Sequence, residues 1–272
     1  MKHLILAGLF ACALPVAALA ADPGPFKDPG KIVFCTEFGD PPAAFLDKDG
    51  QTPAGFEIDL MKAIGGRLGV KTEIKNFKFA SIFAALDAGQ CDGVMSQTSK
   101  SPQRLKIYDF VDYRAEASGI LVKKGNPANL HTYEDLSGRR VAVLLGSANE
   151  RRLKAANDKI VAAGKPPIDI AGYQNNAVAF QELGLGRVDA FASGTLTLAY
   201  FLSMAPGKFE IGGQPIPPTT MGIVIPKAEK AKTKAVGDAW KELVASGQAQ
   251  KIIDDWKLGE GTFLCGGQRA CD

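Results

Sequence analysis

Residues 89–104 read GQCDGVMSQTSKSPQR, a stretch that predicts both a buried strand and the start of a helix. The apolar beginning of Gly93–Ser96 favours a strand, and the polar run Gln97–Ser99 follows it. Ser101-Pro102 then has the pattern of a helix N-cap with proline in the first helical position. Arg104 therefore lies in the first turn of a helix. A guanidinium is unfavourable at the positive end of a helix unless an anion lies in front of it.

Short apolar β-type runs alternate with helical patterns along the chain, which is typical of an α/β fold with mainly parallel sheets. We predict a first βαβαβ unit with its elements at 31–36, 56–68, 71–77, 81–88 and 93–96. We predict a second unit at 139–145, in a helix beginning at 147, and at 169–173, 176–183 and 189–192. A strand at 223–225 and helices within 234–255 then return the chain to the first unit.

Two linkers, 113–119 and 216–222, bracket the second unit, so we predict two lobes joined by two hinge crossings. Lobe 1 is predicted to hold 27–114 and 220–272, and lobe 2 to hold 119–216. Two lobes joined in this way can close around a ligand like a hinged clam. Open α/β sheets bind ligands at the carboxyl ends of their strands, so the polar clusters that follow these strands are predicted to face the cleft between the lobes.

The N-terminus has the composition of an export signal, with a basic start, an apolar run and an A-x-A site at Ala18–Ala20. We therefore predict that residues 1–20 are a signal peptide, cleaved near Ala20. Lipidation at Cys12 is the alternative. Removing Lys2 with the signal leaves 31 of the 32 basic residues against 29 acidic ones, a net charge of +2. This balance does not indicate a nucleic-acid partner.

Four cysteines follow the predicted signal, namely Cys35, Cys91, Cys265 and Cys271. An even number in an exported chain indicates disulfides, with three possible pairings. Zinc is disfavoured because no C-x-x-C spacing is present and His131 is the only histidine after the signal. We expect neither a metal nor a cofactor.

Several motifs occur in an order that resembles the periplasmic solute-binding proteins of ABC importers, specifically the polar amino-acid (family 3) group. They are Gly55–Leu60, Gly89–Ser96, Ser101–Arg104 with Tyr108–Phe110, Leu136–Gly138 and Gly186–Ala190. The resemblance covers nearly all of the mature chain. It implies the periplasmic binding protein type II fold, a location in the periplasm and a membrane permease as partner. We also expect a monomer.

The resemblance implies a role for Arg104. In the family, an arginine at this position forks onto a carboxylate of the ligand, and backbone and hydroxyl groups like those of Thr98 and Ser99, next to Gln97, complete the hold. A planar guanidinium matches a carboxylate bidentately, which makes this a strong charge-assisted contact. The alternative is a surface ion pair of Arg104 with a nearby aspartate, Asp109 or Asp112.

Further site residues are predicted on both lobes. From lobe 2, the helix that begins at Ser147 and Ala148 offers free N–H groups to the same anion. The resemblance places an aromatic pocket wall at Phe79, and Phe38 lies just beyond the first strand. Burial of these phenylalanines in the core is the alternative.

One departure from the family pattern concerns the ammonium group of an amino-acid ligand. Family members usually carry an acidic residue five positions after the aspartate that matches Asp189, but here that position is Gly194. An unpaired ammonium would be costly in a dry cleft. Either the ligand has no α-ammonium or another acid replaces the missing one. Glu37 is our first candidate, with Asp40 and Glu116 after it, although Glu37 could be a solvated rim residue.

A second departure resembles the binding-protein relatives that are associated with quinoprotein alcohol dehydrogenases. Those relatives have cysteines like Cys35 and Cys91, although they typically lack an arginine motif like Ser101–Arg104. In a 2-1-3 strand order the two cysteines lie on neighbouring strands, so a Cys35–Cys91 bridge is plausible. Cys265 and Cys271 would then clamp the tail.

Three classes of function follow. The leading hypothesis is a non-enzymatic binding protein that captures a small carboxylate-bearing solute, an amino acid or a related organic acid, and presents it to a permease. The second is an enzyme of the cyclohexadienyl or arogenate dehydratase type, which needs a general acid such as Glu37 or Glu116 in the cleft. The third is an accessory protein of a quinoprotein dehydrogenase.

Overall fold

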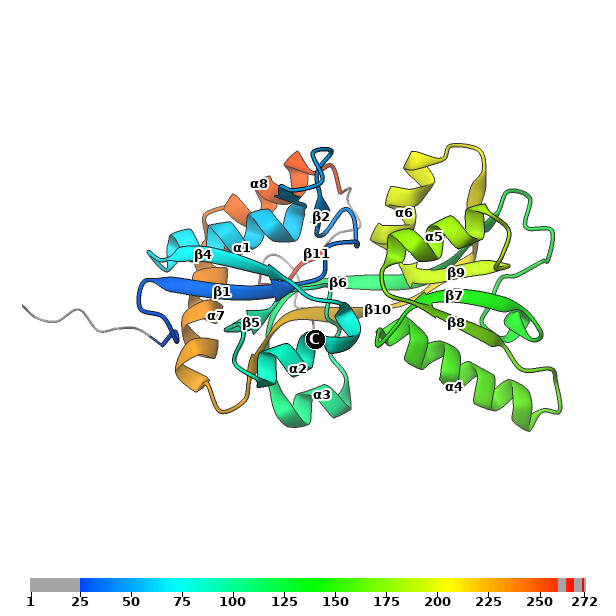
Figure 1. Cartoon of the computed structure of the whole chain (residues 1–272), viewed down its shortest axis with the longest axis horizontal. Coiled ribbons are helices and arrows are strands. Elements are labelled where there is room, and N and C mark those ends of the chain that lie inside the picture. The colour runs from blue at the N-terminus through cyan, green and yellow to red at the C-terminus, as the bar shows by residue number, and fades with distance from the viewer. Residues whose placement is uncertain (1–24, 259–262, 267–270, 272) are drawn as a thin grey trace, which may run out of the picture.

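The computed structural model describes residues 25–258, 263–266 and 271. The predicted signal peptide, its cleavage site and Cys12 lie outside these residues. Figure 1 shows two halves side by side, with two long strands running from one half into the other. We call the half that contains the first strand lobe 1 and the other half lobe 2.

Lobe 1 contains the end of the sheet that is formed by β4 (Lys71–Asn76), β1 (Lys31–Thr36) and β5 (Gly93–Val94), together with the helices that cover it. It also has a separate short pair, β2 (Phe45–Leu46) and β3 (Pro53–Ala54). Its helices are α1 (Phe56–Arg67), the 3₁₀ helix η1 (Phe79–Ser81), α2 (Ile82–Asp87), α3 (Pro102–Ile107), α7 (Lys230–Ala245) and α8 (Gln248–Asp255).

Lobe 2 repeats the same strand order. Its strands are β7 (Arg140–Leu144), β8 (Asp169–Tyr173) and β9 (Ala190–Gly194), and its helices are the 3₁₀ helix η2 (Glu134–Leu136), α4 (Ala148–Ala162), α5 (Asn176–Gly184) and α6 (Thr195–Met204). The crossing strands are β6 (Tyr108–Lys123) and β10 (Phe209–Pro226), and the C-terminal strand is β11 (Phe263–Leu264).

Within the described residues, one nine-stranded sheet joins both lobes in the order β4-β1-β5-β10-β6-β9-β7-β8, with β11 paired to β6. The outer strands pair in parallel, as predicted, in the order second-first-third in each lobe. The crossing strands are antiparallel to each other. The predicted linkers are therefore corrected: 113–119 and 216–222 are parts of the long strands β6 and β10, whose pairing satisfies the backbone groups that a loop would leave to solvent.

Strand β1 shows how the sheet is buried. Ile32 and Phe34 contribute to a core formed with α1, α7 and α8, whereas Val33 and Cys35 point to the other face, against α2. Alternate residues of a strand face opposite sides of a sheet, so a strand covered by helices on both sides is apolar throughout. This is why KIVFC reads as a continuous hydrophobic run.

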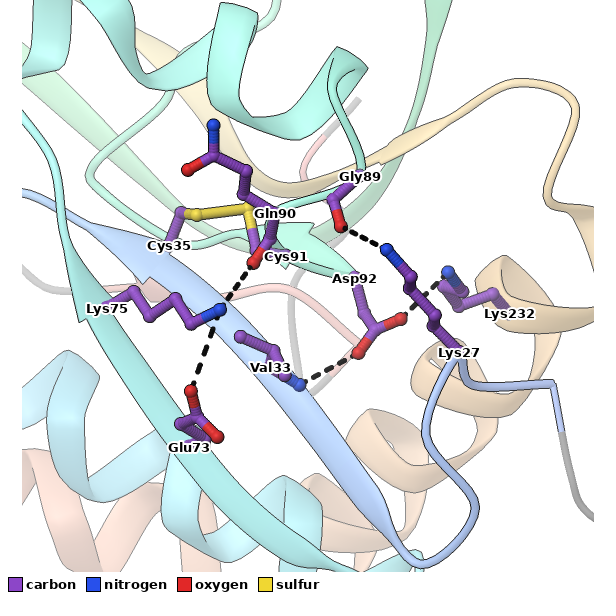
Figure 2. Close-up of a disulfide and its surroundings, with 10 residues drawn as sticks. All are labelled: Lys27, Val33, Cys35, Glu73, Lys75, Gly89, Gln90, Cys91, Asp92 and Lys232. Carbon is purple, nitrogen blue, oxygen red and sulfur yellow. Dashed lines mark hydrogen bonds and ion pairs between the residues drawn. A yellow bond between two sulfur atoms is a disulfide. The ribbon is translucent and has the colours of Figure 1, made fainter.

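The two disulfides are confirmed in one of the three possible pairings. Cys35 of β1 is bonded to Cys91, which precedes β5, and Cys265 is bonded to Cys271. Figure 2 shows Asp92, next to Cys91. Its carboxylate accepts a hydrogen bond from the Val33 amide at 2.8 Å and forms an ion pair with Lys232 of α7 at 2.9 Å. These contacts fasten the loop before β5 to the first strand and to the C-terminal helices. Among the described residues, no helix is both long and apolar enough to cross a bilayer.

Candidate functional site

A polar cleft lies between the lobes, where β1, β5 and β9 end. Its lining residues are Asp40, Phe79, Ser96, Gln97, Ser99, Glu116, Ser118, Leu144, Ser147, Ala148, Asn149, Arg152, Asn176, Ser193, Gly194, Thr197 and Met221. The structure thus brings six of the predicted site residues together in one lining: Phe79, Gln97, Ser99, Ser147, Ala148 and Gly194.

Asp40 connects the two lobes across this cleft. Its carboxylate accepts hydrogen bonds from the side chains of Asn176 at 2.7 Å and Thr197 at 3.0 Å, both on lobe 2, and from Gln97 at 2.6 Å on lobe 1. Burial raises the pKa of Asp40, although these hydrogen bonds oppose the shift. The lobes are therefore closed on one another, with a carboxylate as the meeting point.

Gln97 lies at the centre of the lobe 1 side. Its backbone has a positive φ of 43°, uncommon for a residue other than glycine, and its amide donates to the Glu57 carboxylate at 3.1 Å. This turn ends β5 at Val94, two residues earlier than predicted. The hydroxyl of Tyr113 also donates to Glu57. Burial raises the pKa of Glu57 to about 7, against the opposing effects of Arg114 and Tyr113.

Arg114 and Glu116 form a buried ion pair on β6, at 2.8 Å. Arg114 also donates to the side-chain oxygen of Gln97, and its guanidinium lies 5.5 Å from the centre of the Phe56 ring. Burial alone would lower the pKa of Arg114, but Glu116 and its other neighbours raise it. The second oxygen of Glu116 accepts the amide of Leu196 at 2.8 Å. Glu116 thus reaches from the crossing strand to the start of α6.

Gly194 faces the Glu116 carboxylate directly. A Cβ atom added to Gly194 would lie 2.6 Å from Oε1 and 2.7 Å from Oε2 of Glu116, closer than real Cβ contacts. The space that a side chain at position 194 would occupy is therefore filled by the carboxylate of Glu116.

Arg104 lies beside the cleft and bridges the lobes through backbone oxygens. Its guanidinium donates to the carbonyl of Ser99 at 3.0 Å and to that of Gly146, on lobe 2, at 3.4 Å. It stacks over the rings of Phe83 at 4.5 Å and Phe79 at 5.7 Å. Burial and the nearby Arg151 lower the pKa of Arg104 to about 10.

The alternative partners of Arg104 are occupied elsewhere. Asp109 pairs with Lys230 at 2.6 Å, and Asp112 pairs with Lys100 at 2.5 Å. Ser101 caps α3 by accepting the Arg104 amide, as predicted. Within the described part of the chain, no carboxylate forms an ion pair with Arg104, so its charge is desolvated without being neutralised.

The N-terminus of α4 borders the same region. The helix begins where predicted, and Ser147 caps it by accepting the Glu150 amide at 3.1 Å, while the Glu150 carboxylate accepts the Gly146 amide at 2.6 Å. In this helix, Arg152 reaches the hydroxyls of Ser118 on β6, at 2.8 Å, and Thr219 on β10, at 3.4 Å. One residue of lobe 2 therefore holds both crossing strands.

Glu37, Phe38 and Thr98 lie outside the lining of the cleft. Glu37 is only 4% exposed, so it is no solvated rim residue, and its Oε2 atom has no hydrogen-bond partner within the described residues. Burial, with Asp40 as a second cause, raises its pKa to about 8. Phe38 packs against the core formed with α1. Thr98 is fully buried, and its hydroxyl donates to the Ser96 carbonyl at 3.3 Å.

Phe79 combines both predicted roles. It lines the cleft, is 5% exposed and packs edge-on against Phe83 in the core beneath α2.

Four residues of the site were not predicted from the sequence: Arg114, Arg152, Asn176 and Thr197. Arg114 and Glu116 are two residues apart and so share a face of a strand, a signal that was hidden because the segment was interpreted as a linker. No group of His, Cys, Asp and Glu in 25–258, 263–266 and 271 could hold a metal ion.

The charges around the cleft are divided by sign. Asp40, Glu116, Glu57 and Glu37 gather on one side, where Arg114 is the buried cation. Arg104, Arg151 and the N-terminus of α4 gather on the other, where Glu150 is an acidic neighbour that accepts the Gly146 amide. Such an arrangement can hold a small molecule that carries both a positive and a negative group.

Several known proteins that are similar to this chain are binding proteins. Residues 32–260 match the family model of bacterial extracellular solute-binding proteins, family 3. The L-cystine-binding protein TcyJ of Escherichia coli K12 is 29% identical over 231 residues, 85% of this chain and 84% of the relative. The arginine-binding protein ArgT of Corynebacterium glutamicum is 28% identical over 81% of this chain and 72% of the relative.

Solved structures agree with the fold. An ancestral arginine-binding protein bound to arginine has a TM-score of 0.77 and 33% identity, covering 84% of this chain and 98% of that one. The periplasmic binding protein type II fold predicted from the resemblance is thereby confirmed. The family match extends over both lobes and both crossing strands. The chain belongs to the bacterial extracellular solute-binding proteins, family 3.

Proposed function

We propose that this chain is the periplasmic amino-acid-binding component of an ABC importer and that it closes on its ligand in the cleft between the lobes. The observation that carries the proposal is the division of charge. Arg104, which has no carboxylate partner among the described residues, lies on one side of the cleft, and the buried carboxyl groups of Asp40 and Glu116 lie on the other. A zwitterionic amino acid is complementary to this pattern. The relatives described above are binding proteins, and the chain is a binding protein rather than an enzyme.

The α-carboxylate of the ligand is assigned to Arg104 and the N-terminus of α4. The two backbone carbonyls that Arg104 now contacts are neutral, so a carboxylate that displaced them would gain a charge-assisted, bidentate contact. Ser99 lines the cleft next to Arg104, and Ser147 and Ala148 begin α4. The ligand would then join the lobes, which supports closure upon binding.

The α-ammonium is assigned to Glu116, with Asp40 beside it. Both line the cleft, and Glu116 occupies the space that a side chain at position 194 would fill. The charge that other family members supply from lobe 2 is thus supplied from the crossing strand in this chain. Glu37, the first candidate from the sequence, lies farther back, outside the lining.

A cationic side chain is favoured over a neutral one. Glu37 has a buried carboxylate oxygen without a partner, and a positive ligand group that reached it would remove the desolvation cost that raises its pKa. Relatives named as binding arginine support this choice. L-arginine is therefore the first ligand to test.

Calorimetric titration of the purified full-length mature protein tests the proposal. The ligands are L-arginine, L-histidine, L-cystine and L-glutamine, with agmatine, which lacks the carboxylate, and N-acetyl-L-arginine, which lacks the free ammonium. We expect saturable binding of at least one free amino acid, tightest for L-arginine, and no binding of either analogue. Equal binding of agmatine would contradict the assignment of Arg104. An unresponsive cleft together with a stable protein partner would instead favour the accessory-protein hypothesis.

The remaining expectations belong to the same proposal. The protein would act as a monomer that delivers its ligand to a membrane permease, and lobe boundaries at 114/119 and 216/220 would mark the two hinge crossings. Sedimentation of the mature protein with and without ligand tests the oligomeric state, and a stable dimer would contradict it.

A further inference from the structure

The described residues of the C-terminal tail, 263–266 and 271, lie against both crossing strands. Strand β11 pairs with β6, where Phe263 is opposite Ala115 and Leu264 is opposite Arg114. The amide of Cys265 continues this pairing and donates to the Tyr113 carbonyl at 2.9 Å. At the other crossing, the hydroxyl of Thr220 in β10 donates to the Cys271 carbonyl.

The tail is itself anchored in lobe 1. The indole of Trp240, in α7, donates to the Cys265 carbonyl at 3.0 Å, and Leu264 is buried in the core formed with α1, α7 and α8. The Cys265–Cys271 disulfide, with 5.2 Å between its Cα atoms, joins the part of the tail on β6 to the part on β10. The tail therefore ties both crossing strands to the same lobe.

The position of β11 along β6 leaves only a short segment of β6 between its partners β11 and β9. Ala115 pairs with Thr220 of β10 on one edge and with Phe263 on the other. In lobe 2, β9 occupies that second edge, and its last pair joins Ser118 to Gly194. Between these two partners, Glu116 and Ala117 have no strand pairing on this edge among the described residues.

Strand β10 has its own weak point at the same level. Its register with β6 shifts at three places: between Gly212 and Ile216, between Ile216 and Thr219, and between Met221 and Gly222. The shift at Met221 and Gly222 lies opposite residues 112–114 of β6, where the Cys265 amide holds the Tyr113 carbonyl, whereas the other two shifts lie beyond the contacts of the tail. A strand with irregular pairing breaks fewer hydrogen bonds when it bends than a strand in a continuous ladder does. The segment that can bend therefore begins next to Thr220, the residue that contacts Cys271.

We propose that the C-terminal tail is a hinge clamp that limits the angles between the lobes by fixing β6 and β10 on the lobe 1 side of Glu116. The tail fixes the lobe 1 ends of both crossings, and this confines bending to Glu116–Ala117 on β6 and to 216–219 on β10. Since Glu116 lies inside the bending segment and also carries a cleft carboxylate, the clamp links the angle between the lobes to the place of that charge. The inference rests on the strand pairing and not on the identity of the ligand.

The clamp is tested by measuring the distance between the lobes in the ligand-free, full-length mature protein. Spin labels are attached at Lys71→Cys in lobe 1 and Asp158→Cys in lobe 2, both exposed positions, and their distance distribution is recorded by pulsed electron spin resonance. The variants are C265S/C271S, which opens the tail loop, and T220V, which removes only the contact to β10. T233V is the matched control, because Thr233 hydrogen-bonds to Asp109, at the lobe 1 end of β6, and to the Glu229 carbonyl, and contacts neither the tail nor the bending segments in these hydrogen bonds.

We expect the distribution to be about two-fold wider in C265S/C271S, wider by a smaller factor in T220V and unchanged in T233V, because releasing a local clamp makes more hinge angles accessible. If C265S/C271S does not fold, the test is the comparison of the T220V and T233V distance distributions. Equal distributions in wild type and T220V would overturn the clamp, as would equal widening by T220V and T233V. Failure of any amino acid to bind would contradict the proposed function but would leave this result unaffected.

Discussion

The carboxylate of Glu116 lies where the side chain of residue 194 would begin, and residue 194 is glycine. A Cβ on Gly194 would approach Glu116 Oε1 to 2.6 Å, so the two positions cannot both carry a side chain in this closed arrangement. An acid on the crossing strand and an acid at the end of β9 are therefore alternatives for the same location.

This exclusion predicts the outcome of exchanging the two residues. Gly194→Asp alone should weaken ligand binding and lower stability by about 1–3 kcal/mol, because the new side chain overlaps Glu116 and adds a like charge beside it. Combining Gly194→Asp with Glu116→Ala should recover most of the affinity. Calorimetry and denaturant unfolding provide both values. If Gly194→Asp alone kept wild-type affinity, the side chains of residues 116 and 194 would not compete for the same space.

Arg104 should matter for binding and not for folding. Its guanidinium is desolvated and, within the described part of the chain, contacts backbone carbonyls and aromatic rings but forms no ion pair. Arg104→Ala should therefore leave the melting temperature of the ligand-free protein unchanged or slightly higher. Affinity for the ligand should fall by about 2–5 kcal/mol, the usual effect of truncating one member of a buried charge pair.

Arg187→Ala is the matched control for that prediction, because Arg187 forms an exposed ion pair with Glu182 on lobe 2. It should alter neither affinity nor stability appreciably. If Arg104→Ala binds the ligand as tightly as Arg187→Ala does, the carboxylate must be held elsewhere.

Stability should decrease as the pH rises from about 5 to 8. The folded pKa of Glu37 is raised to about 8, above its ordinary value, so the folded state keeps a proton that the unfolded state has lost. Folding is therefore favoured at low pH, and this contribution is lost as the pH approaches 8. Thermal unfolding of the ligand-free protein should follow this trend, and Glu37→Gln should reduce the slope. A slope that the substitution leaves unchanged would exclude Glu37 as its source.

Binding of a cationic amino acid should have the opposite dependence. The ionised form of Glu37 is the one that attracts a positive group, so affinity for L-arginine should increase between pH 6.5 and 8.5, whereas affinity for a neutral amino acid should not. Calorimetric titrations at several pH values compare the two ligands. Parallel pH profiles would show that the side chain of the ligand does not reach Glu37.

The Cys35–Cys91 disulfide should contribute strongly to stability. It closes a loop with a sequence separation of 56 residues, for which loop-closure entropy gives about 4 kcal/mol. Cys35→Ala with Cys91→Ala should therefore lower the unfolding free energy by roughly this amount, as measured by denaturant titration. A loss no larger than that of C265S/C271S, whose loop spans only 6 residues, would contradict the entropic argument.

The sequence was sufficient for the outer strands of both lobes and for most helices, because each of these follows from local pattern. It was not sufficient for the crossing strands β6 and β10, parts of which were interpreted as linkers. The run KIVFC, the cap at Ser101 and the cap at Ser147 each fix their element through contacts within a few residues. Helix α6 was not predicted. Its sequence TLTLAYFLSM is apolar on several sides because it packs against the sheet and against Phe180 and Phe209, so no amphipathic period marks it.

The site was only partly predictable for a different reason. The roles of Asn176, Thr197 and Arg152 depend on which side chains of lobe 2 meet Asp40 and the crossing strands, and these partners are more than 30 residues away in sequence. The overlap between the Glu116 carboxylate and the side-chain position of residue 194 likewise depends on the pairing of β6 with β9. A polar cluster in the sequence shows that a residue is near the cleft but not where its side chain points.

The most direct test of the charge-divided cleft is a crystal structure of the mature protein with the amino acid that binds most tightly in the calorimetric panel. We predict that its carboxylate lies on Arg104 and the first amides of α4, in place of the Ser99 and Gly146 carbonyls, and that its ammonium lies on Glu116 and Asp40. A ligand bound in the reverse orientation, or one that leaves both carbonyl contacts of Arg104 intact, would contradict the account.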